Sequence, residues 1–488
     1  MINKFECKGT AFHFKLKLKT AIIFIDFSHL QILVGLKYFY LKPYLCPMPA
    51  QKVSFKEINR LAFPAIFAGI IEPLISLTDT AVAGRLPMHT AEALGAIGLV
   101  GSFLSALTWI FVQTSSALSA LVSHAVGQNR LRHLISLNSQ VFWINLGITL
   151  LLSAGSFLLA PWILKLYGAK DLLLEMAIPY LKIRVWGFPF TLLTLTIFGI
   201  FRGLQNTTWA MRISLVGGLT NIGLDLFFVY GLNAGVRGIA FASVIAQGLM
   251  FILAFIQLWR KTPFKTLQVR KRHPLLFRTL RMSVDLFLRT FSLNVALFLA
   301  FRMASLLGHG ENNQYVAAHT LLIQVWLFSS YFLDGYANAG RAIAGKLFGA
   351  KDLKKLNLLI FDVLKIMLFI GILLGIAYYV LQRPIAEMLT HDELVQRTFY
   401  TAFFLVALMQ PINSVAFMMD GIYKGLGETR ILRNVFMLAV LVGFIPPLIL
   451  FYYLGFGLVG IWLAFLIWMI FRAGGLSLHY YKHYWKQA

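Results

Sequence analysis

The sequence predicts an all-α polytopic membrane protein with twelve transmembrane helices in two six-helix lobes. Of its 488 residues, 59% are hydrophobic and 13% are charged, and the mean hydropathy is +0.74. Soluble globular chains carry roughly 45–50% apolar and about 25% charged residues. A soluble enzyme is excluded because too few polar residues remain to cover its surface, and disorder is excluded because it requires low hydrophobicity.

Twelve apolar stretches are long enough to cross a bilayer. A hydrocarbon core roughly 30 Å thick requires about 20 residues of helix. In chain order, the predicted spans cover residues 61–84, 93–120, 135–159, 176–200, 208–231, 236–258, 281–306, 315–340, 357–381, 395–419, 432–454 and 457–480.

The surplus of basic residues orients these spans. The chain has 44 Lys+Arg against 19 Asp+Glu, a formal charge of +25. The basic residues concentrate in every second loop, most densely in residues 260–280 after the sixth span. By the positive-inside rule these loops are cytoplasmic. We therefore expect a multi-pass protein of the plasma (inner) membrane with both termini in the cytoplasm. A nucleic-acid partner is not expected, because the charge belongs to short loops between spans.

An internal repeat divides the chain into two halves. Several residues recur at one constant offset of 222 positions: Gly127 and Gly349, Pro189 and Pro411, the segments 199–204 and 421–426, Thr207 and Thr429, and Gly235 and Gly457. Each unit holds six spans, so both have the same orientation and are related by a pseudo-two-fold axis along the membrane normal, as in many secondary transporters. The predicted domains are an N-lobe (51–259), a basic cytoplasmic linker (260–280) and a C-lobe (281–488).

Residues 1–50 form an N-terminal extension outside this scheme. The apolar stretch 20–36 is interrupted by Asp26 and His29, and no small-residue cleavage site follows it. Our hypothesis is that translation starts at Met48. The alternative is a poorly packed extension.

Carboxylates inside the first span are the strongest candidate functional groups. Burying one at mid-membrane costs at least ~2.5–3.5 kcal/mol, so such residues are functional by default. Asp79 and Glu72 lie two turns apart on one helix face, ~10 Å from each other. Pro64 and Pro73 lie in the same span, and each removes a helical hydrogen bond and favours a bend. This span is therefore a candidate moving part, with Pro64 and Pro73 as its bending points.

Asn221 and Asp225 are four residues apart in the fifth span and share a face. The positions equivalent to Asp79, Asn221 and Asp225 at the 222-residue offset are Phe301, Gly443 and Pro447. Only the first half therefore carries this cluster, which favours a coupling-ion site for H⁺ or Na⁺. The alternative is a set of structural ion pairs with buried arginines.

Other intramembrane charges have a structural interpretation. Asp285 and Arg289 are four residues apart and are expected to neutralise each other, and Asp334 and Arg341 to do so through neighbouring helices. These four could also face a cavity. Asp420, which precedes Gly421, is expected to be a turn or cap residue. We find no Walker motif and no H-E-x-x-H motif, so no ATP-driven domain, enzyme activity, resident metal or other cofactor is predicted.

Several motifs resemble the DinF-like branch of the multidrug and toxic compound extrusion (MATE) family. They are the stretch Leu77–Gly84 after Pro64, the stretch Val284–Arg289 in the seventh span, and Leu333–Ala337 followed by Gly345-x-x-x-Gly349. The resemblance covers about residues 55–480.

The resemblance implies an antiporter that exports organic, often cationic and amphiphilic, compounds in exchange for H⁺ or Na⁺ by alternating access. It implies a coupling-ion site at Asp79, Asn221, Asp225 and Ser243, to which we add Glu72. It associates Pro64 with bending. The expected partners are small organic substrates, the coupling ion and membrane lipid, and we expect a monomer.

The chain departs from the family in two places. Asn413 stands where another branch has a C-lobe aspartate, so that second ion site is not expected. Arg341 stands where DinF-like members can have an acid. A flippase for lipid-linked oligosaccharides or polyprenyl phosphates is the alternative, because Arg289 and Arg341 fit a cationic cavity. A membrane-embedded lipid-modifying enzyme is disfavoured, because the short loops offer no convergent His, Asp and Glu.

Overall fold

A computed structural model describes residues 14–18, 21–25, 53–84, 90–264, 272–307 and 314–487. The chain divides into two compact units, Met1–Pro49 and Ala50–Ala488. The first unit contains an antiparallel pair of strands, β1 (Phe14–Leu18) and β2 (Ala21–Ile25), in which Phe14 lies opposite Ile25. Alternating apolar and basic residues in β1 and isoleucines in β2 favour extended chain. This pair lies in the N-terminal extension that the sequence analysis left outside the helical scheme, and Met48 lies outside the described residues.

The second unit is helical throughout its described residues. Its first part contains α1 (Phe55–Ala83), α2 (Thr90–Phe111), α3 (Gln113–Gly127), η1 (Leu131–Leu134), α4 (Ile135–Leu158), α5 (Ala160–Leu166), α6 (Asp171–Arg184), η2 (Val185–Gly187), α7 (Phe188–Gly203), α8 (Thr208–Leu226), η3 (Phe227–Gly231) and α9 (Gly235–Lys261). Its second part contains α10 (Leu276–Leu307), α11 (Gln314–Gly349), α12 (Leu353–Leu389), α13 (Glu393–Leu408), α14 (Gln410–Leu426), α15 (Thr429–Leu438), η4 (Ala439–Phe444), α16 (Ile445–Tyr453), α17 (Gly457–His483) and η5 (Trp485–Gln487).

These helices confirm the predicted polytopic architecture. Among the described residues, 11 helical stretches are long and apolar enough to span a membrane. The pair α13 and α14, bent by 53°, makes twelve when counted as one span. Large apolar side chains are exposed on the outer faces, such as Leu151 (75% exposed) and Phe298 (69%). Water would oppose such extensive apolar exposure, whereas lipid accommodates it.

Helix breaks recur at equivalent positions of the two repeats. Pro189 lies in the first turn of α7, and Pro411 lies in the first turn of α14. Proline is tolerated there because the first-turn amides have no partner within the helix. The preceding segments are a 3₁₀ turn, Val185–Gly187, and the break at Met409. The same residue at the same offset therefore divides the fourth and the tenth span.

The repeated glycines allow close helix packing in both halves. A Cβ atom on Gly203 of α7 would lie 2.8 Å from the backbone oxygen of Ser119 in α3. A Cβ atom on Gly425 of α14 would likewise meet the backbone oxygen of Arg341 in α11. Ser119 and Arg341 are themselves 222 residues apart. Both members of each contact are therefore related by the repeat.

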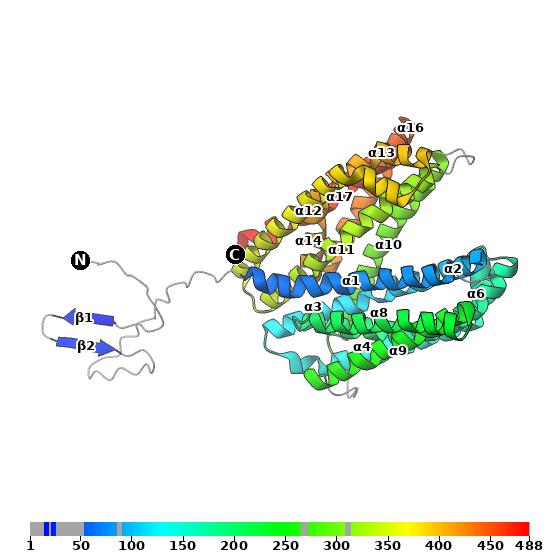
Figure 1. The fold of residues 1–488 in the computed structure, drawn as a ribbon. Helices are drawn as coiled ribbons and strands as arrows, with labels where there is room; N and C mark the ends of the chain where they lie inside the picture. The colour runs from blue at the N-terminus through cyan, green and yellow to red at the C-terminus, as the bar shows by residue number, and fades with distance from the viewer. Residues whose placement is uncertain are drawn as a thin grey trace. The chain divides into compact units, whose positions relative to one another are not determined.

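Helices α1–α9 and α10–α17 form two groups that meet where α1 and α3 pass α11 (Figure 1). The imidazole Nε2 of His124 in α3 lies 2.8 Å from the carbonyl oxygen of Gly425 in α14. The Gln205 amide donates to the carbonyl of Ala342 at 2.6 Å, and the Tyr336 hydroxyl donates to Asn59 at 3.0 Å. These contacts join the groups near the ends of α3 and α11.

Candidate functional site

A cavity of about 400 Å³ lies within the first helix group. Ile71, Ile75, Phe188 and Met250 contribute apolar surface to its wall, and among the described residues Asn338 of α11 is the one lining residue from the second group. Small-molecule sites are typically clefts of roughly 300–1,000 Å³ with mostly apolar walls and a few polar groups. The size and lining of this cavity fit an organic compound.

A buried polar cluster lies in the wall of this cavity. The Ser243 hydroxyl of α9 donates to Asp79 Oδ2 of α1 at 3.4 Å and accepts from Asn221 Nδ2 of α8 at 3.3 Å. Asp225, one turn beyond Asn221 on α8, is fully buried. Asp79 and Asp225 lie close enough to share a hydrogen bond when one of them carries a proton. The structure thus brings Asp79, Asn221, Asp225 and Ser243 together from three helices.

Four buried oxygens in this cluster have no hydrogen-bond partner among the described residues: Asp79 Oδ1, Asn221 Oδ1 and both carboxylate oxygens of Asp225. Buried polar atoms are ordinarily satisfied, and an exception requires an explanation such as a bound ion. The two hydrogen bonds to Ser243 are also long for their type, so they hold the cluster only weakly. Carboxylate, amide and hydroxyl oxygens are suitable ligands for a hard cation. This set of oxygen ligands therefore fits H⁺ or Na⁺.

Two arginines also line the cavity. Arg184 of α6 lies within electrostatic range of both Asp79 and Asp225. When the side-chain amide of Gln247 is oriented with its oxygen toward the neighbouring donors, Arg184 Nη1 donates to that oxygen at 3.1 Å. Arg202 of α7 lines the cavity as well. Neither arginine is a site candidate in the sequence analysis, where basic residues indicate mainly the orientation of the spans. Their position inside spans is the signal that could have identified them, because intramembrane basic residues are as costly as acidic ones.

Pro64, Pro73 and Glu72 are the other candidate residues of the first span. Pro64 and Pro73 lie in the interior of α1, which continues past both as one helix. Bending at these residues stays a prediction. Glu72 belongs to α1, but its side chain lies outside the described part of the structure, and its role also stays a prediction.

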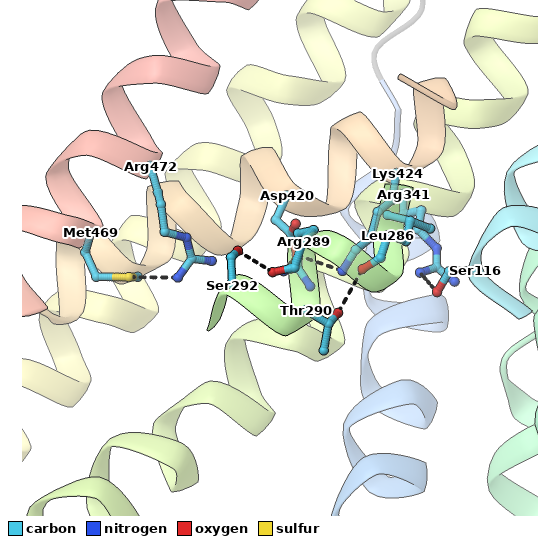
Figure 2. Close-up of polar contacts among 10 residues, drawn as sticks. All are labelled: Ser116, Leu286, Arg289, Thr290, Ser292, Arg341, Asp420, Lys424, Met469 and Arg472. Atoms are coloured by element: carbon cyan, nitrogen blue, oxygen red, sulfur yellow. Dashed lines mark hydrogen bonds and ion pairs between the residues drawn. The ribbon is translucent and has the colours of Figure 1, made fainter. Parts of the chain in front are cut away.

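The expected pairing of Asp285 with Arg289 is wrong. Asp285 pairs with Arg433 of α15 at 2.5 Å and accepts from the Thr429 hydroxyl at 3.1 Å. Arg289 instead donates to Asp420 of α14 at 2.6 Å (Figure 2). The two side chains are close along α10, but each reaches a different neighbouring helix.

Asp420 is not a turn or cap residue. It is buried inside α14, and its Oδ2 accepts from Arg289 at 2.6 Å and from Lys424 at 2.7 Å. Asp334 forms no ion pair among the described residues and is exposed, so the expected pair with Arg341 is not found. Arg341 donates instead to the Ser116 hydroxyl at 3.4 Å.

A further buried cation, Arg472 of α17, was not found from the sequence. It is 1% exposed, and its guanidinium lies over the rings of Phe436 (4.1 Å) and Trp468 (4.8 Å). Cation–π contacts of this kind stabilise a desolvated cation by about 2 kcal/mol. No group of three or more His, Cys, Asp or Glu residues that could hold a metal occurs in the described ranges.

The chain matches known transporters along most of its length. The MatE family model matches residues 64–227 and 290–449. DNA damage-inducible protein F of Escherichia coli is 26% identical over 441 residues, covering 88% of this chain and 93% of that protein. Protein DETOXIFICATION 44, chloroplastic, of Arabidopsis thaliana is 27% identical over 441 residues, covering 85% and 80%. The Vibrio cholerae MATE transporter VcmN in the bent form has the same fold, with a TM-score of 0.81 at 19% identity, covering 88% and 97%.

Proposed function

Because the chain belongs to the MatE family of secondary transporters, which are not enzymes, we propose that it is a cation-coupled antiporter that exports amphiphilic organic compounds. The observation that carries the proposal is the set of four unpartnered oxygens of Asp79, Asn221 and Asp225 beside the cavity. These oxygens hold the coupling ion, H⁺ or Na⁺, and the cavity holds the exported compound.

Burial gives the carboxylates their affinity for the ion. Asp79 and Asp225 lie in a low-dielectric region, where an unpaired negative charge is strongly disfavoured. Binding H⁺ or Na⁺ removes this penalty. Ser243 and Asn221 complete the set of oxygens, and Ser243 joins α9 to α1 through its contact with Asp79. Ion occupancy therefore acts directly on α1.

The proposed transport cycle uses α1 as its moving part. Ion binding at Asp79 changes the geometry of α1 at Pro64 and Pro73, where the helix lacks hydrogen bonds. The cavity then loses affinity for the compound. The similar V. cholerae transporter has been solved in a bent form, which supports a bending transition in this fold. Exchange follows if the ion and the compound favour different states.

The basic loops support a cytoplasmic location for both ends of the helical unit in the plasma (inner) membrane. We propose that the contacts between α3 and α11 close the cytoplasmic side and that the cavity faces outward in this state. We propose that the opposite state forms when these contacts separate.

The test is transport of a fluorescent amphiphile in reconstituted vesicles, with Na⁺ and H⁺ gradients imposed separately. One gradient is expected to drive uptake of the dye into inverted vesicles, and Asp79→Asn is expected to lower the coupled rate at least about tenfold. The control is Glu393→Gln, an acid whose side chain is 84% exposed. Undiminished coupled transport by a normally folded Asp79→Asn protein would contradict the assignment.

A flippase for polyprenyl-phosphate lipids is the second candidate, and the buried cations Arg289, Arg341 and Arg472 favour it. A flippase would translocate labelled lipid phosphate without an ion gradient. The antiporter is preferred because the paired carboxylates supply an ion site that a flippase does not require.

A further inference from the structure

Two arginines from opposite helix groups converge on neighbouring serines of α3. Arg202 Nη2 of α7 donates to the Ser115 hydroxyl at 3.0 Å, and Arg341 Nη1 of α11 donates to the Ser116 hydroxyl at 3.4 Å. The two guanidiniums lie within electrostatic range of each other. Like charges repel, so their approach inside a membrane protein requires a compensating partner.

No carboxylate in the described ranges forms an ion pair with either arginine. Three of their N–H groups, Arg202 Nε and the Nε and Nη2 of Arg341, are buried without a hydrogen-bond partner. Arg341 as a whole is only 3% exposed. Buried charges are normally paired, because an unpaired one is strongly destabilising. The unsatisfied donors therefore indicate a ligand that carries negative charge.

The charged side chains of α10, α14 and α17 beside these arginines give the region a net positive charge (Figure 2). Arg289 and Lys424 share the single carboxylate of Asp420. Arg472 is held by aromatic rings and by a contact from its Nη1 to the Met469 sulfur at 3.0 Å. Asp334 is exposed and forms an ion pair with none of these cations, although it lies within electrostatic range of both Arg202 and Arg341. Two acids therefore face five cations when Arg202 and Arg341 are included.

The fold does not require three of these five cations. At the 222-residue offset, the first-half equivalent of Arg341 is Ser119, and that of Arg472 is Met250. Arg289 is equivalent to Phe67. The first half forms the same packing with neutral residues at these positions, so the charges of the second half have a purpose other than structure.

The cavity reaches this region. Arg202 lines it directly, and so does Asn338 of α11. Asn338 and Arg341 are three residues apart, and Asp334 is four residues before Asn338, so all three share one face of α11. A compound in the cavity therefore lies beside Arg202 and within one helical turn of Arg341.

We propose that Arg202 and Arg341 form an anion subsite that binds the carboxylate of an amphiphilic substrate whose apolar body occupies the cavity. This inference rests on the proposed transport function and names its substrate class. Guanidinium groups match carboxylates in shape and charge and bind them with two parallel hydrogen bonds. A cationic compound would be repelled here. The exported compound is therefore anionic or zwitterionic, in contrast to the cationic compounds expected from the family resemblance.

The subsite also has a consequence for coupling. A carboxylate between Arg202 and Arg341 bridges α7 of the first group and α11 of the second. Because the carboxylate of the substrate and the ion have opposite charges, the exchange does not arise from electrostatic competition between these two groups. It arises instead from the different spacing of the two arginines in the two states, which gives the anion a different affinity for each.

The experiment uses two coumarin dyes, one with a free carboxylate and one with its methyl ester, and the full-length protein in nanodiscs. Binding is measured for wild type, Arg202→Gln and Arg341→Gln. The control is Arg397→Gln, whose side chain is 79% exposed. Wild type is expected to prefer the carboxylate. Arg202→Gln and Arg341→Gln are each expected to lose at least about tenfold in affinity for the carboxylate dye and less than about twofold for the ester.

Arg202→Lys provides a further check, because lysine occupies the equivalent position 424. It is expected to restore part of the carboxylate affinity that Arg202→Gln loses, because lysine keeps the charge but not the two parallel hydrogen bonds. This pair decides the matter if Arg341→Gln does not fold. A wild-type preference for the ester, or equal losses for both dyes, would overturn the subsite. Displacement of the carboxylate dye by polyprenyl phosphate at lower concentration than by the unlabelled carboxylate would overturn the choice of a small carboxylate.

The result separates the subsite from the transport proposal. Gradient-driven transport that depends on Asp79, combined with no preference for the carboxylate, would refute the subsite alone. Selective carboxylate binding without any gradient-driven transport would refute the antiport mechanism and retain the subsite.

Discussion

Ser123 of α3 and Gly345 of α11 contact each other although they occupy equivalent positions of the two repeats, 222 residues apart. A Cβ atom placed on Gly345 would lie 2.6 Å from the Ser123 Cβ. Symmetry-related residues touch only near the symmetry axis. The pseudo-two-fold axis therefore passes between α3 and α11, where the two helix groups meet.

Gly345→Ala is expected to weaken this contact, because the added methyl group has no room unless the helices separate. Such overpacking typically costs about 1–3 kcal/mol. We expect a lower thermal stability in detergent and, in spectroscopic distance measurements, a smaller population in which α3 and α11 are close. Gly474→Ala is the control, because nothing lies within 4 Å of that position. An unchanged distance distribution in Gly345→Ala would contradict the role of this contact.

Ser243→Ala is expected to lower ion affinity while retaining the fold. The substitution removes the hydroxyl that joins Asp79 to Asn221 but leaves both carboxylates in place. Loss of one neutral hydrogen-bonding group costs about 0.5–1.5 kcal/mol, so we expect a roughly 2- to 12-fold higher ion concentration for half-maximal transport.

The measurement is the ion dependence of dye transport in vesicles, and the effect should be smaller than that of Asp79→Asn. Ser102→Ala, which removes an exposed hydroxyl bonded within its own helix, is the control. A Ser243→Ala protein with wild-type ion dependence would exclude the hydroxyl from the ion site.

Asp420→Asn is expected to destabilise the second helix group, because it leaves Arg289 and Lys424 without their shared carboxylate. Removing one partner of a buried ion pair typically costs about 3–5 kcal/mol. Thermal unfolding of the purified protein measures this cost. Glu393→Gln, which breaks an exposed pair with Arg397, should change stability by no more than about 1 kcal/mol. Equal effects of the two substitutions would show that the buried Asp420 pairs stabilise the fold no more than the exposed pair does.

Pro64→Ala is expected to slow transport without reducing ion binding. The substitution restores a backbone donor within α1 and straightens the helix, so the bent state becomes less accessible. Transport rate and ion affinity are measured separately in the same preparation. Pro384→Ala in α12 is the control, because that proline also lies inside a helix but outside the proposed moving part. A normal transport rate in Pro64→Ala would exclude bending at this residue from the cycle.

The architecture could be predicted from the sequence because it depends on properties summed over many residues. Hydrophobic length determines the spans, and the twelve predicted stretches correspond to helices in the structure. The Asn221 and Asp225 pair was identifiable for a similar reason, since a spacing of four places residues on one helix face whatever the tertiary packing.

The ion pairs could not be predicted, because they depend on how neighbouring helices pack. Asp285 and Arg289 have the spacing of a local pair, yet Asp285 reaches Arg433 and Arg289 reaches Asp420. Asp420 was misinterpreted because an Asp-Gly sequence is typical of turns. Here Gly421 serves helix packing instead, since a Cβ atom on it would clash with the Ala337 backbone.

The exclusive placement of Asp79 and Asp225 in one repeat, and of Arg289, Arg341 and Arg472 in the other, has an evolutionary consequence. On the proposed roles, the acids that hold the ion belong to the first repeat alone, whereas the residues that bind the exported compound come from both, with Arg202 in the first and Arg341 in the second. Substitutions at Arg341 can then alter which compounds are recognised while the ion-binding acids stay unchanged. We expect homologous chains to diversify in cargo faster than in driving ion.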